Sequence, residues 1–320
     1  GIDPREAALF MPTSDGPCRF GQYASLQRII LNKSGYEELA ILSPSAQNAY
    51  LGLEGALRKD LWKAILTGDI LYKFYCRVAP YETKPGETRG VLKTVLDRSA
   101  QAFEAGRSYI EILDAARSAF EKVSRHDEAR ALVGIVGEIF VRCNPFSCDR
   151  VVDWVLEHGA EPWLAPISEW ILYTSYIYRY ESKKRLSPGD MAAAFLKNRF
   201  LTRMEHEAYE AAGSLLAHRR EPPMDAMIEK GRAYFPVEFT TEAMLTVGRT
   251  CLFIERDRTD LIVNVSPFTC MPGILTSAVF GQLSAASGIP IVNMYYDGTV
   301  GANGKVAVFL RNLRKPGSLS

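Results

Sequence analysis

Three of the six cysteines occupy the same point of a repeated local pattern: a short apolar segment, a loop that carries the cysteine, and then a helical pattern. They are Cys18, Cys143 and Cys270. Thiolates are the ligands of iron–sulfur clusters, and a loop that leads into a helix N-terminus offers N–H donors and partial positive charge to an anionic cluster. This placement, more than the number of cysteines, predicts an oxygen-sensitive iron–sulfur cluster held by these three residues.

Prolines near all three cysteines would stiffen the ligand loops, because the proline ring fixes φ. They are Pro17, Pro145, Pro267 and Pro272. With three protein ligands, one iron of a [4Fe-4S] cube would stay open to water, sulfide or a substrate oxygen. Such an open iron would allow chemistry beyond electron transfer.

Five side chains next to these cysteines are candidates for tuning the cluster or binding a substrate: Arg19, Arg142, Asn144, Ser266 and Thr269. The two arginines could neutralise cluster charge or hold a substrate carboxylate or phosphate, although surface arginines are often only solvated. The other three could donate hydrogen bonds to cluster sulfur, and capping their own loops is an equal alternative.

The remaining cysteines leave other arrangements open. Cys148, at the start of a predicted helix, is a further candidate thiolate, and with six cysteines a double-cubane [8Fe-9S] centre is also conceivable. Cys76 and Cys251 lie in apolar helical contexts, which predicts packing roles. Three thiolates and a water would also suit zinc, and a buried structural role is the commonest explanation for any single cysteine.

The elements that must position the cysteines are short apolar strands alternating with helices, a pattern that indicates parallel strands buried on both faces. The predicted strands cover residues 8–11, 39–42, 133–141, 162–166, 261–265, 290–295 and 306–310. The last five match a flavodoxin-like count, and in the order 2-1-3-4-5 the first and third are neighbours at the switch point of the sheet. Cys143 and Cys270 would then lie side by side at the carboxyl ends of these two strands.

The chain length of 320 residues fits two domains better than one. We expect a smaller N-terminal α/β unit at 1–128 with a helical insertion, and a flavodoxin-like α/β domain at 129–320 with a helical insertion at about 170–235. The predicted fold is therefore α/β, with flavodoxin/Rossmann-like parallel sheets and the cluster site in the interdomain cleft, which Cys18 closes.

The composition argues against several classes of partner. Lysine plus arginine number 38 against 37 acidic residues, so no overall field would attract nucleic acid or an anionic membrane. No apolar stretch reaches the roughly 18 residues of a membrane-spanning helix, and no secretory signal is apparent at the start. A chain of this size needs no disulfides for its core, so we expect reduced cysteines and a cytoplasmic protein.

Three cysteine motifs carry a family resemblance: GPCRFGQY at 16–23, RCNPFS at 142–147 and NVSPFTCMP at 264–272. They resemble the dehydratase-like region of the large fused acyl-CoA dehydratase activase proteins, which are related to 2-hydroxyacyl-CoA dehydratases and double-cubane cluster proteins. Supporting stretches lie at 80–82, 165–170, 248–249 and 295–298. The resemblance covers nearly the whole chain.

The resemblance implies an anaerobic iron–sulfur enzyme component, a lyase or oxidoreductase. An ATP-dependent activase with its own [4Fe-4S] cluster would supply low-potential electrons to the three-cysteine cluster, where a small-molecule substrate, an acyl-CoA being one candidate, is reduced or dehydrated. The activase itself is not recognised in this chain, and a dimer is expected. Two alternatives stay open: an electron-transfer or regulatory module with a fully ligated cluster, and a cluster-free α/β binding module.

Overall fold

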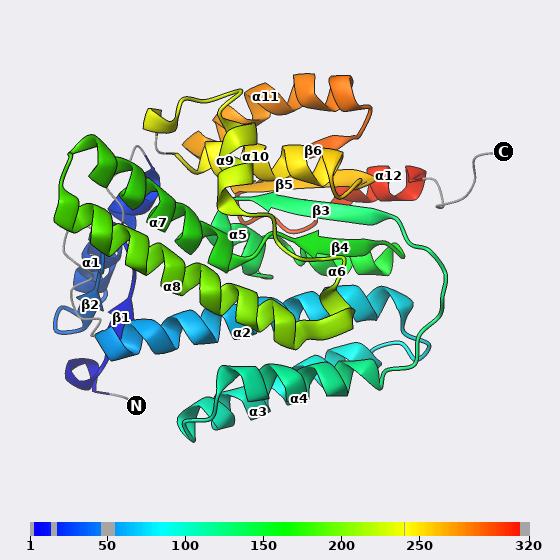
Figure 1. Ribbon diagram of the computed structural model, residues 1–320, viewed down its shortest axis with the longest axis horizontal. Helices are drawn as coiled ribbons and strands as arrows, with labels where there is room; N and C mark the ends of the chain where they lie inside the picture. Colours follow the sequence, from blue (N-terminus) through cyan, green and yellow to red (C-terminus); the bar gives the residue numbers. More distant parts are fainter. Residues whose placement is uncertain (1–2, 14–17, 46–54, 240, 314–320) are drawn as a thin grey trace.

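The computed structural model describes residues 3–13, 18–45, 55–239 and 241–313 and shows a mixed α/β protein with two parallel sheets (Figure 1). The larger sheet consists of β3 (Leu132–Gly137), β4 (Glu161–Leu164), β5 (Leu261–Pro267) and β6 (Ile291–Tyr296). The strand order is β4-β3-β5-β6, and all neighbours are parallel. The predicted order is confirmed for these four strands, so β3 and β5 are neighbours and end at the same edge.

Two of the predicted strands are wrong in extent or type. The strand predicted at 133–141 ends at Gly137, and the chain continues as the short helix α5 (Ile139–Cys143). Gly137 turns the chain at φ 116°, and the carboxylate of Glu138 accepts the N–H groups of the first turn of α5. A glycine and a local cap, Gly137 and Glu138, therefore end the strand in the middle of the run that was predicted to be one strand.

The strand predicted at 306–310 is a helix, α12 (Gly304–Asn312). Its buried residues, Val306, Ala307 and Leu310, follow the spacing of one helical face. A five-residue apolar run fits a strand and a buried helical face equally well, which explains the error. In the described part of the chain the larger sheet thus has four strands, and β6 is an edge strand.

The N-terminal segment has the predicted plan of strand, cysteine loop, helix and strand. Strands β1 (Ala8–Phe10) and β2 (Ala40–Leu42) pair in parallel, and α1 (Tyr23–Lys33) connects them. This unit lies beside the end of the larger sheet at which α5 is found (Figure 1). The loop at 14–17, which contains Pro17, lies outside the described residues.

Helices cover both faces of the larger sheet, as the apolar strands predict. One face packs on α2 (Gly55–Val78), α6 (Val151–Glu157) and α12, and the other on α10 (Glu242–Glu255) and α11 (Met271–Ser287) (Figure 1). The remaining helices are α3 (Glu87–Glu104), α4 (Tyr109–Glu121), α7 (Ile167–Lys184), α8 (Pro188–Ala212) and α9 (Met224–Gly231). Every residue of β3 is buried.

Short 3-10 turns complete the described elements, at Pro4–Glu6, Arg19–Gln22, Ala79–Tyr81, Gly213–Leu216 and Val237–Phe239. A search of the described helices found none with the length and apolar character needed to span a membrane.

The close approach of β3 and β5 gives a test of the fold. A Cβ at Gly137 would overlap with the backbone of Val265, and the residue has a positive φ. Gly137→Ala should therefore lower the free energy of unfolding, measured with urea, by at least about 2 kcal/mol. Gly281→Ala, at an open position of α11, is the control and should stabilise the protein by about 0.5–1 kcal/mol. Equal stabilities of the two variants would contradict the described strand pairing.

Candidate metal centre

Two of the three candidate ligands, Cys18 and Cys270, come from opposite ends of the chain and lie close together. The guanidinium of Arg19 donates a hydrogen bond of 2.7 Å to the carbonyl oxygen of Phe268, which joins the two cysteine loops. Burial raises the pKa of the Cys270 thiol most, and the charge of Cys18 raises it further. The fold therefore brings together two of the three loops that the sequence singled out.

Both of these thiols occupy the N-cap of a helical segment, where a loop leads into the helix. Cys270 precedes α11 and Cys18 precedes the 3-10 turn at Arg19–Gln22. Burial raises the pKa of both thiols, and a backbone N–H of the following turn, from Gly273 or Phe20, opposes that rise. These N–H groups are the donors that an anionic sulfur ligand would use.

Cys143 occupies a different local position from the one predicted. It ends the short helix α5, and the next helix, α6, begins only at Val151. After burial, the carboxylate of Glu138 contributes to raising the pKa of all three thiols, Cys18, Cys143 and Cys270. All three thiols therefore feel the charge of one carboxylate, which directly follows β3.

Burial decides the protonation of these thiols. It raises the pKa of Cys143 to about 12 and that of Cys270 to about 11, both well above the value of an exposed thiol. The pKa of Cys18 is also raised, chiefly by burial. At neutral pH the free thiols are thus neutral, and metal binding would have to release their protons.

Among the described residues, no group of three or more His, Cys, Asp or Glu side chains could hold a metal ion. This result bears on a mononuclear site such as the zinc site weighed from the sequence. A four-iron cluster is bulkier than one ion and needs its thiolates farther apart. The structure brings together two of the three candidate thiols, Cys18 and Cys270, with N–H groups of the turns that follow them, whereas Cys143 lines a small cavity with Cys148.

The two candidate arginines have structural partners. Arg142 is only 4 % exposed and donates hydrogen bonds to the carbonyl oxygens of Gly137, Ala165 and Pro166, at 2.6, 3.0 and 2.9 Å. It therefore ties the ends of β3 and β4 together and does not face solvent. Arg19 is more exposed, but it bridges to the Cys270 loop.

The three smaller candidates form the cysteine loops. Asn144 accepts the N–H of Ser147 at 3.0 Å, so its side chain caps its own turn, which was the alternative weighed from the sequence. Ser266 is buried beside Gly273 in the first turn of α11. Thr269, directly before Cys270, has a φ of 61°, a strained value of the kind that often marks functional loops.

The other cysteines behave largely as predicted. Cys76 and Cys251 are buried in apolar clusters, in agreement with packing roles. Cys148 is also buried, and its thiol approaches the carbonyl oxygen of Pro145 at 3.9 Å. Cys143 and Cys148 line the same small cavity, together with Tyr72, Arg150 and Asp153.

Two acidic residues of the site were missed from the sequence. Glu138 leaves the sheet directly after β3, and Glu242 lies in the first turn of α10 behind its N-cap Thr241. Burial, followed by the charge of Glu138, raises the pKa of Glu242 to about 7. In the sequence, Glu138 and Glu242 could be recognised only as residues typical of helix starts. Such a position does not tell which distant side chains the carboxylate will contact.

A network of buried charges lies behind the cysteines. Arg249 of α10 is fully buried and forms ion pairs with Glu221 and, at 3.5 Å, with Glu169 of α7. Glu169 also lies 3.7 Å from Arg142, and Lys73 of α2 pairs with Glu221. Although burial raises the pKa of Glu221, Arg249 and Lys73 lower it to about 2.

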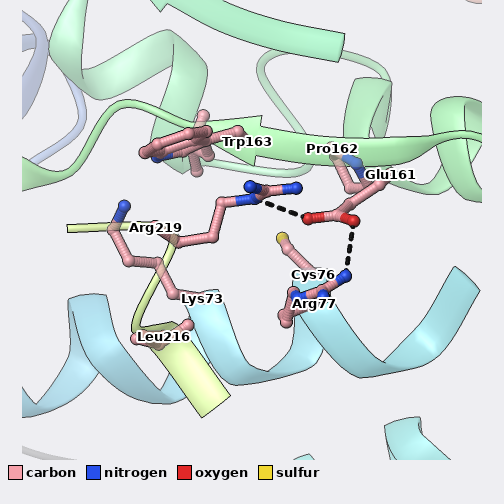
Figure 2. Close-up of a pocket in the computed structure, with 9 residues that line it drawn as sticks. Lys73, Cys76, Arg77, Glu161, Pro162, Trp163, Leu216 and Arg219 are labelled. Carbon is pink, nitrogen blue, oxygen red and sulfur yellow. Dashed lines mark hydrogen bonds and ion pairs between the residues drawn. The ribbon is translucent and has the colours of Figure 1, made fainter. Parts of the chain in front are cut away.

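Another buried carboxylate, that of Glu161 at the start of β4, lies at the opposite end of the sheet. Figure 2 shows it between Arg77 and Arg219. It accepts hydrogen bonds from Arg77, Tyr81 and Arg219 at 2.8, 2.6 and 2.7 Å. Glu161 and the two arginines line a small cavity. Because Arg77 and Arg219 are both paired with Glu161, we interpret the group as a structural ion cluster and not as a ligand site. It is also remote from the cysteine edge.

Comparison with known proteins adds no identification: no family model, no curated protein and no solved structure matches the chain.

The thiol environment predicts an unusual pH profile in the metal-free protein. Since only the thiolate is nucleophilic, alkylation of Cys143 and Cys270 by iodoacetamide should keep accelerating up to about pH 10, without a plateau. Rates for each cysteine can be measured by mass spectrometry of quenched samples. In urea the alkylation rates of the same cysteines should level off above the ordinary thiol pKa, about 8.5. A plateau at that pH in the folded protein would contradict the described burial.

The buried ion network predicts a large cost for removing Arg249. Arg249→Met removes the positive charge that faces the buried carboxylates of Glu221 and Glu169. It should lower the free energy of unfolding by about 3–5 kcal/mol. The control is Arg203→Met, because Arg203 forms an exposed pair with Glu207 and should matter by less than about 0.5 kcal/mol. Urea denaturation at neutral pH measures both. A similar small loss in the two variants would show that Arg249 is not the buried charge described.

Proposed function

We propose that this chain is an iron–sulfur protein of the 2-hydroxyacyl-CoA dehydratase-like superfamily that binds a [4Fe-4S] cluster through Cys18, Cys143 and Cys270. The observation that carries the proposal is the meeting of the Cys18 and Cys270 loops, each at a helical N-terminus, at the sheet edge where Cys143 also lies. The resemblance of the three motifs supports it. The interdomain cleft between 1–128 and 129–320 belongs to the same proposal.

The chemistry supplied by such a cluster, when bound, is one-electron transfer and an iron open to a substrate oxygen. The residues of the chain would hold and shield it. The N–H groups of Phe20 and Gly273 would favour negative charge on the sulfur ligands. Glu242, whose pKa of about 7 is set by burial, would hold or release a proton near neutral pH beside the thiols.

The proposed partner is an ATP-dependent activase that delivers low-potential electrons, and the proposed substrate is a small molecule such as an acyl-CoA. The reaction would be a reduction or a dehydration in an anaerobic cytoplasm. A dimer of this chain or of similar subunits belongs to the proposal. Nucleic acid and membrane are not proposed as partners, since the net charge is only +1.

A second candidate function is electron transfer or regulation with a fully ligated cluster. The observation that favours it is the shared cavity of Cys143 and Cys148, because a fourth thiolate from Cys148 would close the open iron. A double-cubane [8Fe-9S] centre would need still more ligands, and the packing of Cys76 and Cys251 leaves those two in apolar clusters.

Anaerobic purification or reconstitution tests the proposal. The protein should be brown and contain about four irons and four sulfides per chain, or about eight irons for a double cubane. Cys143→Ala and Cys270→Ala should each lose most of the iron, whereas the control Cys251→Ala should keep it. Iron and sulfide analysis together with EPR of the reduced protein measure these outcomes.

The variant Cys148→Ala separates the two candidates. If Cys148 is the fourth ligand, this variant should change the EPR spectrum and lose iron; if the iron is open, the variant should match the wild type and small oxygen ligands should shift the signal. Iron that remains far below stoichiometric after anaerobic reconstitution would favour the cluster-free binding module and refute both.

A further inference from the structure

The turn that follows Cys143 is held in a strained conformation. Asp149 and Arg150, neither of them glycine, have φ values of 47° and 56°. Two successive residues in the left-handed region are unfavourable and persist only where other contacts hold them. These contacts come from outside the turn.

A buried asparagine supplies them. The side-chain amide of Asn303, which is 0 % exposed, donates to the carbonyl oxygens of Cys148 at 3.0 Å and Asp149 at 2.6 Å. Its own oxygen accepts a hydrogen bond of 2.7 Å from the hydroxyl of Tyr296 at the end of β6. The N–H of Gly301 donates to the carboxylate of Asp149 at 3.1 Å.

Asn303 occupies the N-cap of α12 but does not cap that helix. An asparagine at this position normally accepts an N–H from the first turn of its own helix. Here the oxygen is used by Tyr296 and the amide by the distant turn. A role confined to starting α12 would not require this orientation.

The strained turn is connected to Cys143 by short hydrogen bonds. The N–H of Cys148 donates to the carbonyl oxygen of Asn144 at 3.2 Å, and that of Arg150 donates to the carbonyl oxygen of Pro145 at 2.7 Å. Displacement of the peptide groups at 148 and 149 would therefore displace the residues directly after Cys143.

We propose that Asn303, oriented by Tyr296, is a positioning residue that sets the geometry of the Cys143–Cys148 loop through the carbonyl groups of Cys148 and Asp149. The part of this inference that concerns a cluster rests on the proposed function of Cys143. The part that concerns the loop does not, so each can fail alone.

The test uses the full chain without metal and measures native-state alkylation of each cysteine by mass spectrometry. Asn303→Ala should raise the rates of Cys143 and Cys148 by about tenfold or more, because the strained pair can relax. The rate of Cys251, which lies in a separate apolar cluster with Val247 and Phe280, serves as the internal control and should not change. Tyr296→Phe, a milder variant that leaves the amide of Asn303 in place, should give a smaller rise at the same two cysteines.

A second substitution to glycine tests whether Asn303 acts by holding the backbone of Asp149 and Arg150 or by stabilising the region in general. Glycine adopts a positive φ without strain, so Arg150→Gly added to Asn303→Ala should bring the alkylation rates back toward those of the wild type. No change in the single variant, an equal rise at all cysteines, or a double variant no slower than Asn303→Ala would each overturn the proposal for the loop.

Reconstitution under anaerobic conditions then tests the link to the cluster. If the loop result holds, Asn303→Ala should bind iron but lose it in air several times faster than the wild type. Equal rates of iron loss would overturn the link while leaving the loop result intact. A wild-type protein that takes up no iron would refute the proposed function, again without affecting the alkylation result.

Discussion

Burial of Arg249 is the constraint on which the arrangement around the cysteine edge depends. A guanidinium removed from water needs anionic partners, and Arg249 finds them in Glu221 and Glu169. These residues come from α10, from the segment before α9 and from α7, so three parts of the chain must be in place together. Lys73 of α2 forms a further ion pair with the carboxylate of Glu221. The network therefore fixes the helices on both sides of the sheet.

The same network reaches the cysteine edge through Arg142. Glu169 lies 3.7 Å from Arg142, whose donors are directed at the carbonyl groups where β3 and β4 end. Cys143 follows Arg142 directly, so its position depends on a buried arginine held on several sides. Cys270 is placed independently, by β5 and the start of α11, and Arg19 ties the Cys18 loop to it.

The surroundings of the thiols combine two opposing effects. Burial raises their pKa values and favours neutral thiols, while the N–H groups of helical first turns favour negative charge on sulfur. At neutral pH the first effect prevails, so the free thiols are protonated and unreactive toward electrophiles. If a cationic cluster core replaced the thiol protons, it would compensate the negative charge of the buried sulfur atoms. The N–H groups would then stabilise the same negative charge.

The sequence by itself determined the parallel strands and the loops that lead from Cys18 and Cys270 into helices, because apolar pattern and turn residues are local properties. The order β4-β3-β5-β6 was predicted from the flavodoxin-like alternation of strands and helices. The sequence pattern misassigned 306–310 and the end of β3, where short apolar runs carry no period. Only the tertiary structure decided the roles of Arg142, Glu242, Arg249 and Asn303. Their partners lie far away in the sequence, and a polar residue shows no local sign of whether water or a buried counter-charge will meet it.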